Sequence, residues 1–269
     1  MTLINRMPTY FISHGGGPWP WLDNMREVFK HLKVSLEAMP GELPEKPKAI
    51  LMISGHWEEH DFAIMSSPRP GMEYDYYGFP EHTYRIKYPA PGSPEVAARV
   101  QALLTEAGIK SSLDPDRGFD HGTFAPLAVS YPNADVPVVQ LSIKKGYDPE
   151  AHLKLGRALA PLRDEGVLII GSGLSYHNLR AFNASAVKPS HEFDGWLRQT
   201  LLESVPAVRR QRLMEWEKAP SARFAHPQED HLIPLMVAVG AAEEDHAVLC
   251  YHEDELMGGI AVSSFRFGQ

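Results

Sequence analysis

The chain has 269 residues, of which 43% are hydrophobic and 22% charged, and its net charge is −8. These values are typical of one large or two small globular domains, and the acidic balance argues against a general nucleic-acid-binding or anionic-membrane surface. The single cysteine excludes an internal disulfide, no apolar run approaches the ~20 residues that span a bilayer, and the N-terminus lacks the apolar core of a signal peptide. We therefore expect a cytoplasmic protein that binds neither nucleic acid nor membrane.

Strands and helices are predicted to alternate along the chain. Short apolar runs bounded by turn residues predict strands at about 9–13, 49–53, 136–143 and 167–170, and a final hairpin of 247–251 and 260–267. Helical spacing predicts helices over 21–38, 94–106, 149–162, 190–204, 206–218 and 226–239. This order is typical of α/β proteins. We expect one catalytic domain, residues 1–269, with a central mixed β-sheet flanked by helices.

Three of the predicted strands are followed by a histidine. His14 directly follows the predicted strand 9–13. His56 follows strand 49–53 after a Ser-Gly turn, and His177 follows strand 167–170 after a loop that begins with Gly-Ser-Gly. Ligands of α/β sheets lie outside the carboxyl ends of strands, and small neighbours leave the space that a metal site needs. Alone, His14 or His56 is equally well explained as a structural histidine, but their repetition favours a shared metal ion.

Other histidines complete the pattern. His231 lies in the first turns of a predicted apolar helix, where it is either a solvated surface residue or the third nitrogen ligand beside His14 and His56. His121 and His177 lie in predicted glycine-bounded loops, and an imidazole with a pKa of about 6.5 suits proton transfer at neutral pH. The spacing therefore indicates a mononuclear metal site but names no reaction.

The segment 66–94 is irregular and rich in proline, glycine and tyrosine. So long a loop within a compact domain is usually functional or disordered, and its aromatic content argues against disorder. Two interpretations remain open. The aromatic residues wall a binding pocket, or they only anchor the loop to the domain.

Several short motifs follow one another along the chain: Ile-Ser-His-Gly at 12–15, Ser-Gly-His-Trp at 54–57, Tyr-Gly-Phe-Pro at 77–80, Ile-Lys-Tyr-Pro-Ala-Pro-Gly at 86–92, Asp-His-Gly-Thr at 120–123, Gly-Ser-Gly at 171–173 with His-Asn-Leu at 177–179, and His-Pro at 226–227 with His-Leu-Ile-Pro-Leu at 231–235. In content and order they resemble the LigB-type (class III) extradiol ring-cleaving dioxygenases. The similarity runs from about residue 9 to residue 267 and is greatest to the 4,5-DOPA extradiol dioxygenase-like branch.

The resemblance implies a reaction in which a small-molecule catechol, DOPA-like or a related phenolic, is opened by O2 to a semialdehyde. It implies that His14, His56 and His231 hold the metal, with His177 as a fourth ligand when no substrate is bound. It further implies that His177 is the acid/base catalyst and that His121 is a second histidine in the oxygen pocket. Fe(2+) is expected for activity. Zn(2+) suits the same three neutral imidazoles but lacks the redox chemistry.

Two rival functions share these histidines. A zinc-dependent hydrolase would use metal-bound water and needs a carboxylate base, for which Glu58 and Asp230 are the nearby candidates. A non-catalytic binding protein is disfavoured because all the expected histidines are present. The sequence does not determine which catechol is used, which ring bond is cleaved, the native metal or the oligomeric state.

Overall fold

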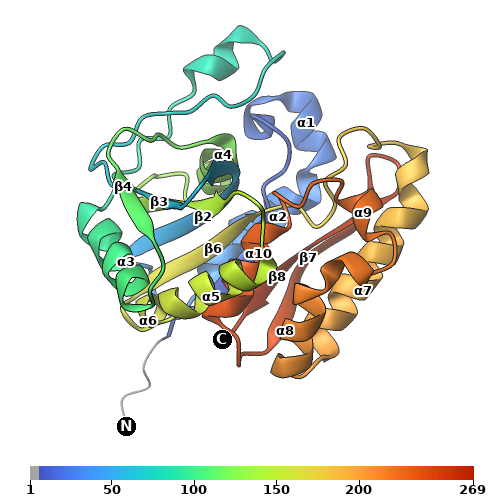
Figure 1. Ribbon diagram of the computed structural model, residues 1–269. Helices are drawn as coiled ribbons and strands as arrows, with labels where there is room; N and C mark the ends of the chain where they lie inside the picture. Colours follow the sequence, from blue (N-terminus) through green and yellow to red (C-terminus); the bar gives the residue numbers. More distant parts are fainter. Residues whose placement is uncertain (1–5) are drawn as a thin grey trace.

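An eight-stranded mixed β-sheet forms the centre of the molecule, with strand order β4-β3-β5-β2-β6-β1-β8-β7 (Figure 1). The computed structural model describes residues 6–269, so the first five residues of the predicted domain lie outside the described part. The strands are β1 (Thr9–Ser13), β2 (Ala49–Glu59), β3 (Phe62–Met65), β4 (Ser111–Asp114), β5 (Val138–Lys144), β6 (Val167–Gly173), β7 (Ala247–Leu256) and β8 (Ile260–Phe267). The predicted α/β class with a mixed sheet is confirmed.

The four central strands β5, β2, β6 and β1 run parallel. In their registers Ser13 pairs with Gly173, and Ser54 pairs with Ser172. The carboxyl ends of β1 and β6 therefore meet at one edge of the sheet, beside the second half of β2. That edge is where α/β sheets place their ligands. Antiparallel partners flank the parallel core, with β3 beside β5 and β8 beside β1.

Helices cover both faces of this sheet (Figure 1). They are α1 (Asp23–Val28), α2 (Lys30–Ala38), α3 (Pro94–Glu106), α4 (His121–Ser130), α5 (Pro149–Leu159), α6 (Pro161–Asp164), α7 (Val187–Glu203), α8 (Pro206–Met214), α9 (Ala222–Ala225) and α10 (Ile233–Ala241). Short 3-10 helices occupy Trp19–Trp21, Met39–Glu42, Glu81–Arg85, Ala184–Ala186 and Trp216–Lys218. Within residues 6–269, no helix combines the length and apolar character that crossing a bilayer requires.

The two helical layers can be assigned from β6. Gly171 lies against the backbone of Pro234 in α10, whereas the Ser172 hydroxyl donates a hydrogen bond to the carbonyl of Gly122 in α4. Because successive residues of a strand point to opposite faces, α10 and α4 cover opposite faces of the sheet. All nine residues of α10 are buried, since α5 packs on its outer side. This explains why α10 is apolar around its whole circumference.

Several predicted boundaries were wrong. The helix predicted over 21–38 is two helices, because the chain leaves helical geometry at Phe29. The strand predicted to end at residue 53 has no Ser-Gly turn and continues to Glu59, with a register shift against β5. The helix predicted over 226–239 begins only at Ile233, where Pro234 occupies its first turn. The predicted helix 94–106, strand 9–13 and C-terminal hairpin are confirmed.

The contact between α5 and α10 depends on Gly156 and Gly240, which face each other. A Cβ on Gly240 would lie 2.2 Å from the carbonyl oxygen of Leu153. We expect Gly240→Ala to lower the free energy of unfolding by about 1–3 kcal/mol, because the helices must separate. Gly195→Ala, in α7 with nothing within 4 Å of the new methyl group, should instead raise stability by about 0.5–1 kcal/mol. Urea denaturation measures both, and equal stabilities of the two variants would contradict this packing.

Candidate metal centre and cavity

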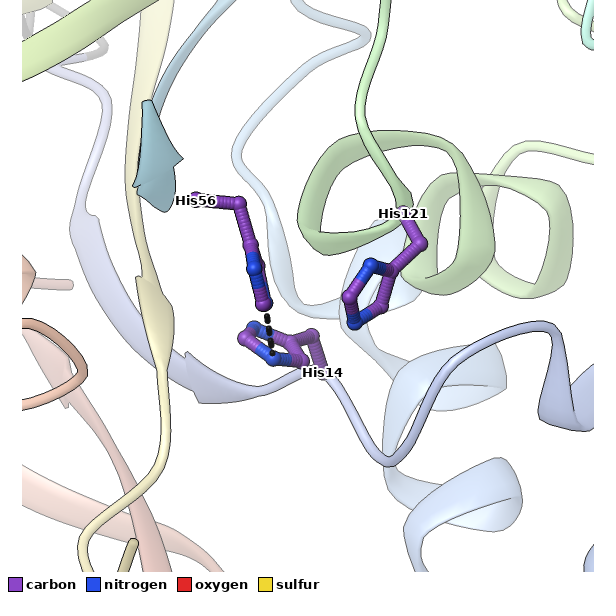
Figure 2. A group of neighbouring side chains, drawn as sticks. All are labelled: His14, His56 and His121. Atoms are coloured by element: carbon purple, nitrogen blue, oxygen red, sulfur yellow. Dashed lines mark hydrogen bonds between the residues drawn. The ribbon is translucent and has the colours of Figure 1, made fainter. Parts of the chain in front are cut away.

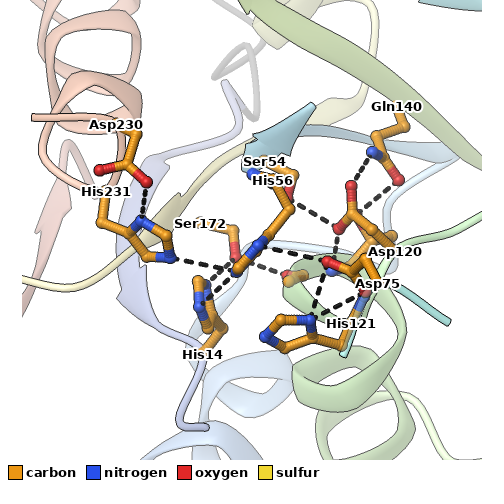
Figure 3. Close-up of polar contacts among 12 residues, drawn as sticks. His14, Ser54, His56, Asp75, Asp120, His121, Gln140, Ser172, Asp230 and His231 are labelled. Carbon is orange, nitrogen blue, oxygen red and sulfur yellow. Dashed lines mark hydrogen bonds and ion pairs between the residues drawn. The ribbon is translucent and has the colours of Figure 1, made fainter. Parts of the chain in front are cut away.

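Three histidines from distant parts of the chain meet at the carboxyl edge of the parallel sheet (Figure 3). His14 directly follows β1, His56 lies within β2, and His231 lies in the turn before α10. The Nε2 atom of His56 is 3.2 Å from Nε2 of His14 and 3.1 Å from Nε2 of His231. Nitrogens bound at about 2.1 Å to one metal ion lie about 3.0–3.4 Å apart, so this spacing matches a shared ligand set.

The outer nitrogen of each imidazole has a polar partner. Nδ1 of His14 is 3.1 Å from the Ser172 hydroxyl, whose own proton is donated to the Gly122 carbonyl. The serine oxygen therefore accepts from Nδ1–H of His14. Nδ1 of His231 lies 2.7 Å from Asp230, and Nδ1 of His56 lies 3.2 Å from Asp75. These partners place the proton on Nδ1 and leave the Nε2 lone pairs facing inward, as in metal-ligating histidines.

Burial keeps these three imidazoles uncharged. Desolvation, reinforced by the neighbouring histidines, holds the pKa of His14 and the pKa of His56 well below the usual range. The same desolvation lowers the pKa of His231 to about 4, although Asp230 opposes the shift. Neutral Nε2 atoms 3.1–3.2 Å apart direct lone pairs at one another, which is unfavourable unless a cation lies between them. The residues present therefore fit a metal ion.

A backbone contact fixes the position of His231. Its carbonyl oxygen would be 2.0 Å from a Cβ on Gly173 and accepts a hydrogen bond from the Leu174 amide. Only glycine at the end of β6 lets the turn that carries His231 lie directly on the sheet. The glycines noted in the sequence thus position the ligand as well as leaving space around it.

Two further histidines border the same site, and each shares a carboxylate with one of the three. Nδ1 of His121 is 2.9 Å from both oxygens of Asp75, which also faces His56. The His177 ring stacks on His231 at 3.4 Å between centroids, and its Nδ1 is 3.8 Å from Asp230. The ligand atoms of His14, His56 and His121 also lie within 4.8 Å of one another (Figure 2). The structure thus brings all five predicted site histidines together.

Both carboxylates are held ionised. Burial alone would raise the pKa of Asp230, but its contacts with His177 and His231 hold that pKa well below the usual range. Burial would likewise raise the pKa of Asp75, but its contacts with His121 lower that pKa overall. Each anion therefore faces the Nδ1 atoms of two imidazoles. Each carboxylate thus links one outer histidine to one of the three inner histidines.

The placement of His121 differs from the prediction of a loop. His121 is the first residue of α4, and Asp120 is the N-cap, accepting a hydrogen bond from the Thr123 amide. The Asp120 carboxylate also accepts from Ser54 and from Arg117, so it turns away from the neighbouring imidazole. Its burial, together with nearby Asp75, raises its pKa. Asp120 thus anchors α4 to β2, and the residue that orients His121 is Asp75.

Sequence reasoning missed Asp75. It lies in the irregular segment 66–94, between Tyr74 and Tyr76, well separated in the chain from His56 and His121, which it contacts (Figure 3). Nothing in its local spacing marks it, and a lone acid between tyrosines is the only signal. The interpretation of this segment as a pocket wall is confirmed for Tyr76 and Phe79, which line the site, whereas Tyr77 is 91% exposed.

A cavity of about 440 Å³ opens above the histidines. Its floor is formed by the five site histidines and Asp75, and its walls come from α1, the segment 66–94, the segment 174–182 and the β7–β8 turn. The volume lies in the range of small-molecule sites, about 300–1,000 Å³. The cavity is therefore large enough for a small organic ligand.

These features define a metal-dependent enzyme whose substrate is a small organic molecule. Residues 8–264 match the family model described as the catalytic LigB subunit of aromatic ring-opening dioxygenase. The chain belongs to this LigB family, and it is an extradiol aromatic ring-opening dioxygenase. The resemblance found in the motifs is confirmed.

Relatives of known name match along nearly the whole chain. The chain is 42% identical to a 4,5-DOPA dioxygenase extradiol of Beta vulgaris, with 98% of this chain and 97% of the relative covered. It is 32% identical to the Escherichia coli K12 protein of the same name, covering 98% and 95%. The crystal structure of uncharacterized protein JW3007 from Escherichia coli K12 superposes with a TM-score of 0.79 at 30% identity, covering 98% and 100%.

The shared carboxylate of Asp75 provides a test of the centre. We expect Asp75→Asn to weaken metal binding by about 10–100-fold. The neutral amide lacks the negative charge of the carboxylate, so it orients His56 and His121 less strongly. Competition with a chromophoric chelator measures this affinity. Asp61→Asn, which removes surface ion pairs with Lys110 and Lys144, is the matched control and should leave the affinity unchanged. Equal affinities for the two variants would show that Asp75 does not orient the ligands.

Proposed function

We propose that this protein binds Fe(2+) through His14, His56 and His231 and uses O2 to open the aromatic ring of a catechol between one hydroxylated carbon and its non-hydroxylated neighbour. Both oxygen atoms enter the product, a ring-opened semialdehyde. The observation that carries the proposal is the contact of three neutral Nε2 atoms, 3.1 and 3.2 Å apart, at the floor of a cavity with two further histidines.

The bound ion supplies Lewis acidity toward the two hydroxyl oxygens and the redox chemistry that lets O2 react. The protein contributes three imidazoles and leaves the remaining coordination positions free. Tautomers fixed by Ser172, Asp75 and Asp230 keep the Nε2 atoms available, so no ligand has to lose a proton on binding. Because the three ligands are neutral, they would not neutralise the ion, whose positive charge would then stabilise the anionic form of the catechol.

His177 is the proposed acid/base catalyst. Asp230 lies on its Nδ1 side, which leaves Nε2 as the atom that accepts a proton from a catechol hydroxyl. Its stacking on His231 supports a role for this base beside a ligand rather than in the ligand set. The same Nε2 can later return this proton to the substrate. In this arrangement, as in the catalytic triad of serine proteases, a carboxylate orients a catalytic histidine.

His121 is the proposed second histidine of the oxygen pocket. Its Nδ1 donates to Asp75, so Nε2 remains for the reacting oxygen atoms. Its ring lies 4.0 Å from the His56 ring, centroid to centroid, on the side of the site away from His177. Apolar side chains border these histidines on the cavity side, and such shielding would protect a reactive intermediate from side reactions.

The contacts of the nearby carboxylates disfavour the zinc hydrolase. Asp230 is engaged with His231, and Glu58 bonds to the hydroxyl of Tyr147 and does not line the cavity. Asp75 lines it but is engaged with His121. Among the described lining residues, no carboxylate is left to activate a metal-bound water. Zn(2+) would occupy the same site without supporting ring opening.

We also propose a cytoplasmic location. The single cysteine, Cys250, is free, and burial raises its pKa to about 12. A thiol so held is unreactive and fits a reducing compartment. Secretion out of the cytoplasm, detected by fractionation, would contradict this.

Substitution of the histidines separates metal binding from catalysis. His14→Ala and His56→Ala should abolish binding of Fe(2+), because each removes one of three ligands. His177→Ala should keep the metal and lose about 10²–10⁴-fold in turnover, the usual contribution of a general acid/base. Elemental analysis and single-turnover kinetics measure the two properties. A ligand variant that stays fully loaded would contradict the assignment.

Reconstitution tests the reaction itself. The apoprotein is loaded anaerobically with Fe(2+) or with Zn(2+), and oxygen uptake is recorded with DOPA, caffeate, protocatechuate and an alkylcatechol. We expect uptake and a semialdehyde chromophore with Fe(2+) alone, because ring opening needs a redox-active ion. Ester hydrolysis by the zinc form, with no uptake by the iron form, would instead establish the rival hydrolase.

A further inference from the structure

The cavity has a polar end and an apolar end. The histidines and Asp75 lie at the floor, where the catechol oxygens bind. Beyond them, the ring substituent meets carbon and sulfur atoms from separate parts of the chain, namely Met25, Phe29, Phe79, Leu179, Phe182 and Met257. Leu179 is 75% exposed and Met257 is 44% exposed, so these two side chains border the mouth.

No positive side chain faces this space. Among the lining residues in the described part of the chain there is no lysine and no arginine. The neighbouring Arg180 is exposed and lies outside the lining, and Arg117 is paired with Asp120. Asp75, at the floor beside the histidines, is the one carboxylate among these described lining residues. A negatively charged substituent at the apolar end would therefore find no side-chain counter-charge.

We propose that the enzyme selects catechols whose ring substituent is uncharged and apolar, and that it discriminates against a carboxylate at that position. This inference rests on the proposed ring-opening function and narrows its substrate class. Its physical basis is desolvation, because an ionised carboxylate that leaves water without a partner loses its hydration and gains nothing in return. An alkyl or ester group of the same size gains from burial against the apolar wall.

Hydrocaffeate and its methyl ester form a matched pair that differs mainly in charge. With the Fe(2+)-loaded protein, we expect kcat/KM for oxygen uptake to be at least about tenfold higher for the ester, chiefly through a lower KM, because the penalty falls on binding. Anaerobic titration calorimetry of the loaded protein should show the same preference. Equal values for acid and ester, or a preference for the acid, would overturn the proposal.

A charge placed at the mouth should reverse the selection. Leu179→Lys supplies the missing cation at an exposed position, and we expect it to reduce the ester-to-acid ratio by at least about fivefold, as a new ion pair offsets desolvation. Leu179→Gln has similar size without charge and should keep the original ratio. Thermal unfolding of both variants verifies that the fold is retained. An unchanged ratio in Leu179→Lys would count against the charge mechanism.

The two levels of the proposal fail differently. If the loaded protein binds the ester more tightly than the acid but consumes no oxygen with either, the charge selection stands and the ring-opening function is wrong. If it consumes oxygen with both at equal kcat/KM, the function stands and the charge selection is wrong.

Discussion

The structure is organised around three imidazole nitrogens that point at one another. Such an arrangement is unfavourable for an apoprotein, since neutral lone pairs repel and protonated rings would repel more strongly. It persists because His14, His56 and His231 are each fixed from outside, by β1, by β2 and by a turn pressed onto Gly173. The surrounding fold therefore offsets the repulsion among the three nitrogens, and a bound cation would relieve it.

The carboxylates Asp75 and Asp230 make equivalent contacts on two sides of the site. Each contacts one inner histidine and one outer histidine, so the orientation of the metal ligands is coupled to the orientation of the two candidate catalytic groups. Their negative charges also offset a dication without occupying its coordination positions. The lack of lysine and arginine among the described lining residues is the basis of the proposed selection against a charged substituent.

The wrong predictions share a cause. The strand predicted to end at residue 53 continues because Glu58 and Glu59 pair with β5, and the register shift lets His56 turn toward the site within the strand. The helix predicted to open near Pro227 begins instead near Pro234, although proline suits either first turn. Local propensity cannot choose between such positions, because the choice depends on which backbone groups find partners in the sheet.

By itself, the sequence predicted the α/β class and drew attention to five histidines: His14, His56 and His177 because each follows a buried strand, and His121 and His231 because of the predicted loop and helix that carry them. Family motifs added the reaction class. Only the tertiary structure decided that Asp75 orients His121 and His56, that Asp120 caps a helix instead, and that the substituent pocket lacks positive charge. These facts depend on contacts between segments far apart in the chain, and such contacts form only when the sheet brings its edges and loops together.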